Sequence, residues 1–139
     1  MFRKILVAND GSKGGQLALA AALELAKRLD LALAMICVED LPRFPASIDE
    51  VAEAQADAAG LFDKVVAAAK ALAQTHGVAF ESHIVAGHPV SSIAEFIRRG
   101  GYDLLVVGFM GHSALYNRII GSTTDRLVEL APCKVLVVK

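Results

Sequence analysis

Short apolar runs that alternate with longer segments of helical periodicity constrain this sequence of 139 residues more than any other feature. Each run has few polar interruptions, which is typical of parallel strands covered on both faces. In the intervening segments apolar positions recur near the helical period of about 3.6 residues, so one side of each helix should face a core. We expect strands at residues 4–8, 31–38, 80–85, 104–107 and 133–139, and helices at residues 15–29, 48–76, 90–99 and 125–131.

This alternation predicts an α/β fold, with an open parallel five-stranded sheet, right-handed crossovers and helices on both faces. The run at 80–85 mixes polar and apolar residues more than the others, which favours an outer strand. The pattern alone does not order the strands. If the first and fourth strands are neighbours, Asp10 and Gly108 lie at one crevice at the carboxyl ends of the strands.

Capping and stop residues support the predicted helix ends. Ser47 and Glu50 have the spacing of a capping box before the second helix. Gly77 can take the left-handed conformation that ends a helix, and Pro89 suits a first turn. Pro132 ends the last helix before the fifth strand.

Composition indicates a globular domain. Hydrophobic residues make up 55% of the chain and charged residues 21%. A chain of this length buries roughly two thirds of its unfolded surface, so we expect one domain over residues 1–139. No apolar run is long enough to span a bilayer, and the N-terminus lacks a signal peptide's apolar region, so we expect a cytoplasmic protein. A net charge of -1 gives no basic field, which argues against nucleic acid as a main partner.

The cysteines and histidines do not have the spacing of a metal site. Cys37 falls inside an apolar run and Cys133 at the start of another, so we expect buried structural thiols. The histidines are scattered along the chain, and we do not expect a zinc site.

Glycines follow the predicted fourth strand and return before the last helix. Gly108 and Gly111 lack a Cβ atom, so their backbone can take positive φ and approach a ligand closely. Ser122 and Thr123 follow Gly121 at a helix start, where unpaired N–H groups and the helix dipole favour an anion. The alternative is that these are ordinary turn glycines and an ordinary N-cap.

The spacing of Gly108, two residues, Gly111, nine residues and then Gly121-Ser122 resembles the nucleotide-binding signature of the universal stress protein family. The resemblance extends over nearly the whole chain, from the first strand and Asp10-Gly11-Ser12 to the apolar run that ends at Val138. It implies a single universal stress protein domain over residues 1–139 with the adenine nucleotide alpha hydrolase-like fold. In that fold the strand order is 3-2-1-4-5, which places Asp10 and Gly108 at one crevice.

The resemblance also implies how a nucleotide would lie. The glycine loop and the helix start would hold phosphates, and Asp10 would bind a ribose hydroxyl or a phosphate-bound metal. The alternative role for Asp10 is to cap the turn before Gly11. Backbone groups at Val38 would meet the adenine. The predicted binding residues are Ala8, Asn9, Asp10, Val38, Gly108, Met110, Gly111, His112, Gly121, Ser122 and Thr123.

One departure from the family pattern concerns phosphate charge. Phe109 and Met110 stand between the loop glycines, where many relatives have a polar or basic residue that reaches the ligand. A charge contact to phosphate is therefore missing, unless Arg118 or His112 replaces it. We expect a triphosphate to be held less firmly than a monophosphate.

The leading hypothesis is a nucleotide-binding stress-response or regulatory module that takes ATP, ADP or AMP, with Mg²⁺ as an optional companion of the phosphates. Its output would be a change of conformation or partner. The alternative is a slow ATPase or autophosphorylating enzyme, with Ser122, Thr123 or Ser113 as acceptor, although no general base is evident. A phosphoacceptor receiver domain fits less well, because only Asp10 follows the first strand and no aspartate ends the third.

The last strand predicts the oligomeric state. The run from Val135 to Val138 is continuously apolar, yet the strand order implied by the resemblance places it at a sheet edge. An exposed apolar edge invites aggregation unless another chain covers it. We therefore expect a homodimer through this strand, as the family resemblance also implies.

Overall fold

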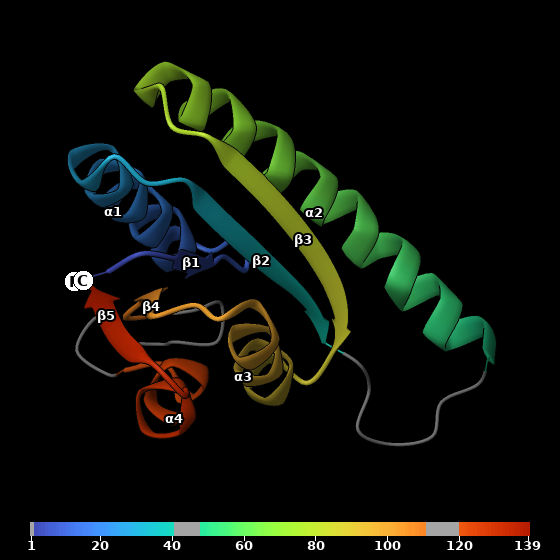
Figure 1. The fold of residues 1–139 in the computed structure, drawn as a ribbon. Coiled ribbons are helices and arrows are strands. Elements are labelled where there is room, and N and C mark those ends of the chain that lie inside the picture. The colour runs from blue at the N-terminus through green and yellow to red at the C-terminus, as the bar shows by residue number, and fades with distance from the viewer. Residues whose placement is uncertain (1, 41–47, 111–119) are drawn as a thin grey trace.

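The computed structural model describes residues 2–40, 48–110 and 120–139, without the side chains of residues 51 and 54–59. Strands and helices alternate along the chain, as the apolar pattern predicts (Figure 1). The order is β1 (Ile5–Ala8), α1 (Lys13–Leu29), β2 (Leu33–Asp40), α2 (Ile48–His76), β3 (Phe80–Gly87), α3 (Pro89–Gly100), β4 (Leu104–Gly108), α4 (Ser122–Leu130) and β5 (Lys134–Val138).

The strands form one parallel sheet in the order β3-β2-β1-β4-β5. Ile5 of β1 pairs with Leu33 of β2 on one side and with Leu104 of β4 on the other. The chain therefore reverses its direction of winding between β1 and β4, and the open α/β fold with this strand order is confirmed. Parallel sheets of this kind bind ligands at such a switch point, outside the carboxyl ends of the strands.

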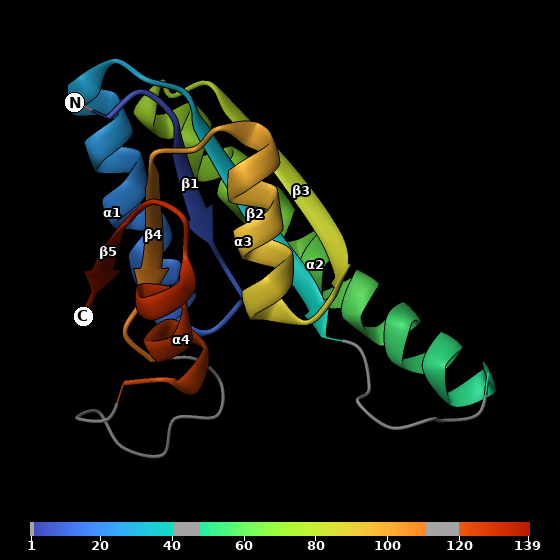
Figure 2. The ribbon, with the colours of Figure 1, turned by 60° about the horizontal axis from the view of Figure 1, so that its bottom comes forward.

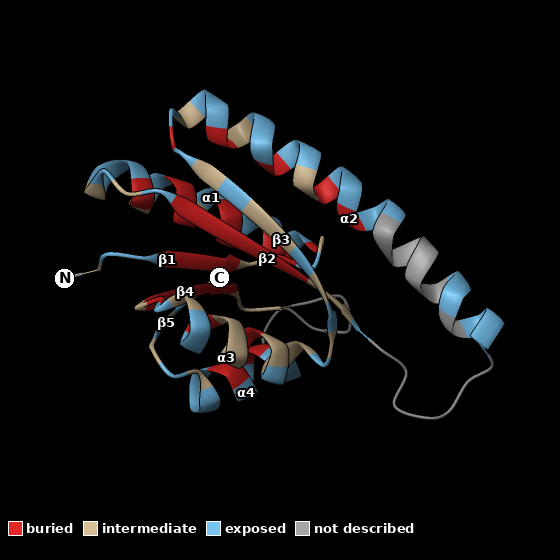
Figure 3. Ribbon diagram, turned by 45° about the vertical axis from the view of Figure 1, so that its right-hand side comes forward, coloured by how far each residue is buried: buried red, intermediate tan, exposed pale blue. Residues whose placement is uncertain are grey.

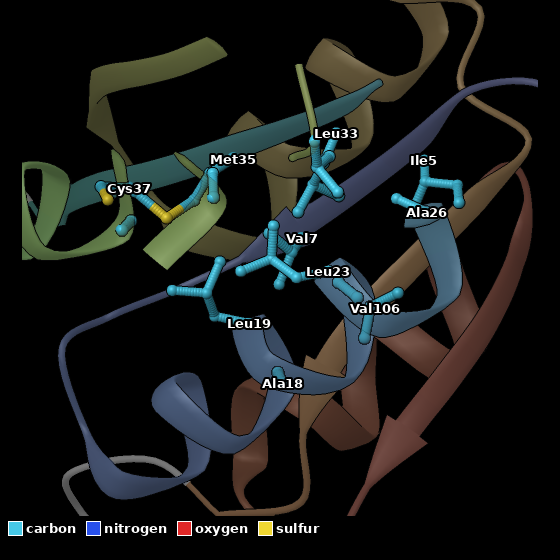
Figure 4. Close-up of a cluster of buried hydrophobic side chains, with 14 of the residues drawn as sticks. Ile5, Val7, Ala18, Leu19, Leu23, Ala26, Leu33, Met35, Cys37 and Val106 are labelled. Atoms are coloured by element: carbon cyan, nitrogen blue, oxygen red, sulfur yellow. The ribbon is translucent and has the colours of Figure 1, made fainter. Parts of the chain in front are cut away.

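Helices cover both faces of the sheet, with α1 and α2 on one and α3 and α4 on the other (Figure 2). Strands β1, β2 and β4 are buried on both faces (Figure 3), which explains their lack of polar alternation. The core under α1 and α2 contains Val7, Met35, Cys37 and Leu19 (Figure 4). The core under α3 and α4 contains Leu6, Ile36, Ile93, Ile97, Leu105 and Leu127.

Several element boundaries differ from the sequence-based expectation. Strand β3 ends at Gly87 rather than at residue 85, and α4 begins at Ser122 rather than at residue 125. Strand β2 and helix α1 also differ. Strand β2 continues to Asp40, because Glu39 and Asp40 pair with Ala86 and Gly87 of β3. Helix α1 begins at Lys13 rather than at residue 15, because the Ser12 side chain caps it. Both differences extend ordered structure toward the carboxyl edge of the sheet, where the candidate site lies.

The predicted helix stop at Gly77 is confirmed, and Gly101 ends α3 in the same way. Gly77 follows α2 with a φ of 69° and Gly101 follows α3 with a φ of 67°, both left-handed. Pro89 occupies the first turn of α3. Ser47, the expected cap of α2, lies outside the described residues. None of the described helices combines the length and the apolarity needed to cross a bilayer.

The outer strands differ from the central ones in exposure. Strand β3 forms one edge, as its mixed composition predicts, and β5 forms the other. Leu136 of β5 is 40% exposed, and Val128 and Leu130 of the neighbouring α4 are also exposed. This edge therefore presents apolar side chains to solvent.

Candidate functional site

A pocket of about 440 Å³ opens at the carboxyl ends of β1, β2 and β4. Helices α3 and α4 begin beside it, and the middle of α2 contributes Leu61 and Phe62. The lining residues are Ala8, Asn9, Asp10, Ser12, Gly15, Ile36, Val38, Glu39, Asp40, Leu61, Phe62, Pro89, Ile93, Val107, Gly108, Met110, Gly121, Ser122, Thr123, Thr124 and Leu127.

The pocket brings together residues that are far apart in the sequence. Those predicted from the sequence that line it are Ala8, Asn9, Asp10, Val38, Gly108, Met110, Gly121, Ser122 and Thr123. Gly111 and His112 lie outside the described residues, as do Arg118 and Ser113. The pocket therefore gathers the predicted residues that the structure describes together with others that were not predicted, and their role in binding stays a prediction.

One rim of the pocket, which we call the Asp10 rim (residues 9–12), is a turn held by side-chain oxygens. Asn9 Oδ1 accepts a hydrogen bond of 3.0 Å from the Gly11 amide. Asp10 Oδ1 accepts one of 2.9 Å from the Ser12 amide and another from the Ser12 hydroxyl. Ser12 Oγ in turn accepts from the Gly15 amide at 3.1 Å, which caps α1. Asp10 thus does cap its turn, the alternative role considered from the sequence, and its side chain also lines the pocket.

Asn9 forms part of the floor beneath this rim. It is 2% exposed, and its backbone N–H donates to the Ile36 carbonyl at 3.0 Å. Its side-chain amide nitrogen lies 3.7 Å from the sulfur of Met35, a weak acceptor. Asn9 therefore ties β1 to β2 where both strands meet the pocket.

The opposite rim, which we call the Gly108 rim (residues 108–110 and 121–124), corrects one expectation. The sequence suggested that Gly108 can take positive φ and let a ligand approach closely, but its φ is not positive. A Cβ atom built on Gly108 would lie 2.4 Å from the Gly14 carbonyl oxygen and 2.9 Å from Gly14 Cα. One built on Gly14 would lie 1.8 Å from the Met110 oxygen. The first turn of α1 packs directly on the end of β4, so Gly108 is required by this packing, although it also lines the pocket.

Thr124 fastens the start of α4 to the end of β4. It is 7% exposed, and its hydroxyl donates to the Gly108 carbonyl at 2.6 Å. The Gly121 amide donates to the Phe109 carbonyl at 2.8 Å. Thr124 was not among the residues predicted from the sequence, which ended with Ser122 and Thr123. The unbroken run of hydroxyl residues after Gly121 could have pointed to Thr124 as a third candidate.

The N-terminus of α4 faces the pocket without a side-chain cap. Its N-cap is Gly121, not Ser122 or Thr123, and this glycine has no side chain with which to bond the first-turn amides. Exposed N–H groups at a helix start, together with the helix dipole, attract anions. Ser122 and Thr123 are exposed at this point and line the pocket. The Gly108 rim can therefore accept a phosphate through main-chain donors.

The lining carries negative side-chain charge. Glu39 and Asp40 line the pocket together with Asp10, whereas the described lining residues include no lysine or arginine. The strand expected from the sequence ended at residue 38, so Glu39 and Asp40 fell outside it. Two consecutive acids at the end of a predicted strand were the signal that could have identified them.

The cysteines stand apart from this chemistry. Cys37 is fully buried, as expected, and burial raises the pKa of its thiol to about 12, with the Asp10 charge as a smaller cause. Cys133 is half-buried, and burial raises its pKa as well. Neither lines the pocket. Across the described ranges, no group of three His, Cys, Asp or Glu side chains could hold a metal ion.

Comparison with known proteins gives one consistent result. The sequence model of the Universal stress protein family matches residues 1–139. Universal stress protein MJ0531 from Methanocaldococcus jannaschii is 31% identical, over 100% of this chain and 83% of its own length. The structure of universal stress protein UspA from Lactobacillus plantarum superposes with a TM-score of 0.88 at 28% identity, over 99% of this chain and 98% of that one.

Two more distant structures with the same fold hold nucleotides. A universal stress protein in complex with cAMP has a TM-score of 0.76 at 23% identity, over 99% of this chain and 97% of that one. A universal stress protein family protein from Arabidopsis thaliana with AMP bound has a TM-score of 0.74 at 21% identity, over 99% of this chain and 91% of that one.

Proposed function

The chain belongs to the universal stress protein family, and from that premise we propose that its pocket binds an adenine nucleotide and that the bound state changes its conformation or its choice of partner. One observation carries the proposal. The uncapped N-terminus of α4 and the Asp10 carboxylate line the same pocket, at the switch point of the sheet. Structural neighbours that hold cAMP and AMP support an adenine nucleotide as the ligand.

The chemistry of the lining suggests how the nucleotide lies. The first-turn amides of α4 would donate to a phosphate, and Asp10 would accept from a ribose hydroxyl across the pocket. The base would lie at the end of β2, against Val38 and Ala8, where apolar side chains can cover its faces. We also propose that Gly111 and His112, which lie outside the described residues, contact the bound nucleotide.

Mg²⁺ would accompany ATP or ADP rather than occupy a cage of protein ligands. This ion is usually held by one or two carboxylates together with substrate phosphates. Asp10 fits that role in part, because its Oδ1 already accepts two hydrogen bonds from Ser12. The ion would supply neutralisation of phosphate charge.

Calorimetry with AMP, ADP and ATP on protein freed of ligand tests the proposal. We expect heat from at least one nucleotide, and no heat from any would refute the proposal. Val38→Trp should abolish binding, because the indole fills the end of the pocket where the base would lie. Val85→Trp is the matched control, because Val85 pairs with Val38 on the neighbouring strand and does not line the pocket.

Slow ATP hydrolysis or autophosphorylation is the second candidate function. The observation that favours it is the position of the Ser122 and Thr123 hydroxyls, exposed at the N-terminus where a phosphate would bind. Release of phosphate from ATP above background would support it, provided that Asp10→Ala abolishes this release. Mass spectrometry of protein incubated with Mg-ATP would detect a phosphorylated residue, and an unmodified mass with no phosphate release would exclude both reactions.

We also propose that the protein is a cytoplasmic homodimer in which the β5 strands of two copies pair. The exposed side chain of Leu136 on this edge strand supports it, because pairing would cover that apolar surface. Light scattering should give twice the mass of one chain, and Leu136→Arg should reduce it to one. Lys134→Ala, on the same strand but at a charged position, should leave the dimer intact. A monomer at working concentrations would contradict this proposal.

A further inference from the structure

We propose that the protein binds a small zwitterionic metabolite, with the carboxylate and ammonium groups of an amino acid, in a second pocket at the opposite edge of the sheet. This amino-edge pocket has a volume of about 250 Å³ and lies where β1, β2 and β3 begin. It shares no lining residue with the first pocket among those that the structure describes. The lining residues that carry the inference are Arg3, Lys4, Ala32, Ala34, Glu81 and Tyr102.

Small side chains on β2 create the hollow. Ala34 is paired in register with Leu6 of β1 on one side and with Glu81 of β3 on the other. Ala34 packs on the face of the sheet that α3 and α4 cover. Ala32, two residues earlier, lines the pocket as well. Two methyl groups stand where the neighbouring strands carry longer side chains, so the floor lies lower than the walls.

Glu81 forms the acidic wall of the amino-edge pocket. The Tyr102 hydroxyl donates to Glu81 Oε1 at 3.4 Å, and His83 Nε2 lies 3.5 Å from the same oxygen. Burial raises the pKa of Tyr102, and the charge and hydrogen bond of Glu81 raise it further, so the hydroxyl keeps the proton that it donates. These contacts orient the carboxylate through Oε1. Its second oxygen can therefore accept from the ammonium group of a ligand.

Arg3 and Lys4 form the basic wall. Their backbone amides donate to the Asp103 carboxylate at 2.8 and 3.1 Å, which fixes the segment that carries both cations. The Lys4 ammonium donates to the Gly100 carbonyl and lies 4.6 Å from the centre of the Tyr102 ring. Tyr102 thus contacts both walls, with its ring against the cation and its hydroxyl against Glu81.

This arrangement of charge favours a ligand that carries both signs. A ligand with only negative charge is repelled by Glu81, and one with only positive charge is repelled by Arg3 and Lys4. Pockets for drug-sized ligands measure about 300–1,000 Å³, so a pocket of 250 Å³ suits a smaller molecule. A small amino acid combines this size with both charges. The inference does not rest on the proposed function, because it concerns a different edge of the sheet.

Nuclear magnetic resonance titration of the full chain with L-alanine, acetate and methylammonium tests the inference. We expect L-alanine to shift the backbone amides of Ala34 and Glu81 saturably, and to leave that of Gly121 in the first pocket unchanged. It should bind about fivefold more tightly than either singly charged probe, the factor that one exposed ion pair can contribute. No saturable shift with L-alanine, or equal binding of acetate, would overturn the inference.

Variants of each wall separate the two charges. Glu81→Gln should weaken L-alanine binding about fivefold and leave acetate binding unchanged or improved. Lys4→Met retains the apolar stem beside Tyr102 and should weaken both ligands. The matched controls are Glu129→Gln and Lys27→Met, which change the same charges at exposed positions outside the pocket. Equal losses in the controls would assign the effect to net charge and refute the site. Circular dichroism verifies folding, and the three probes on the unmodified protein decide independently of any variant.

Discussion

The two rims of the pocket are built on opposite principles. The Asp10 rim is held by side-chain oxygens of Asn9, Asp10 and Ser12, each of which accepts a hydrogen bond from the turn or from α1. The Gly108 rim is held by close packing of main chains, because the backbone of Gly14 occupies the space where a Cβ atom on residue 108 would lie. Thr124 is the one side chain among the described residues that bonds the start of α4 to β4.

This difference predicts how each rim responds to substitution. A hydrogen-bonded turn loses one bond at a time and retains its shape through the others. A close contact between two main chains cannot relax, since neither partner can rotate away. The Gly108 rim should therefore tolerate substitution much less than the Asp10 rim.

Gly108→Ala should give the largest effect. The added Cβ would lie 2.4 Å from the Gly14 oxygen, and α1 would have to move away from β4. We expect the free energy of unfolding to fall by about 3 kcal/mol, because a clash with backbone cannot be relieved by a change of side-chain rotamer. Urea denaturation measures this loss. A midpoint equal to that of the unmodified protein would show that α1 and β4 are not in such close contact.

Thr124→Val should give the next largest effect. Valine has nearly the same shape, but it leaves the Gly108 carbonyl without its donor, which lowers the free energy of unfolding by about 2 kcal/mol. The start of α4 is then held less firmly, so AMP affinity should fall as well. Thr124→Ser is the control, because it retains the hydroxyl. Equal losses for valine and serine would assign the effect to packing of the methyl group instead.

Features of the fold that depend on local sequence could be predicted, whereas the order of the strands could not. The central strands were predictable because burial on both faces removes polar alternation, and Gly77 and Pro89 mark helix ends by local backbone preference. The strand order was implied by the family resemblance and not by periodicity, since a pattern of apolar runs contains no information on which strands are neighbours.

The site was predictable only in part. Asp10 could be identified because a carboxylate after a strand has local meaning, whereas the contact between Gly14 and Gly108 joins segments that are far apart in sequence. A glycine required by a distant backbone looks the same in sequence as one that admits a ligand. Glu39 and Asp40 were missed because their inclusion in β2 depends on pairing with β3, a tertiary contact.

Ser12→Ala sharpens the comparison from the other rim. It removes the cap of α1 and one of the hydrogen bonds to Asp10, which should lower the free energy of unfolding by about 1 kcal/mol. AMP affinity should fall severalfold, because Asp10 loses part of its orientation. Ser12→Thr retains the acceptor and serves as the control. A loss larger than that of Gly108→Ala would reverse the proposed ranking of the rims.

Gly60→Ala should give the smallest effect, and with the opposite sign. Gly60 lies inside α2, and among the side chains and backbone that the structure describes, a Cβ atom built there meets nothing within 4 Å outside its own helix backbone. Alanine in a helix interior is favoured over glycine, so the free energy of unfolding should rise by about 0.5–1 kcal/mol. Urea denaturation beside Gly108→Ala compares the same substitution at two glycines. A methyl group should stabilise the protein at Gly60, which has room for it, and destabilise it at Gly108, which lies against backbone. If Gly60→Ala also lowers the free energy of unfolding, the loss at Gly108 cannot be assigned to the contact with α1.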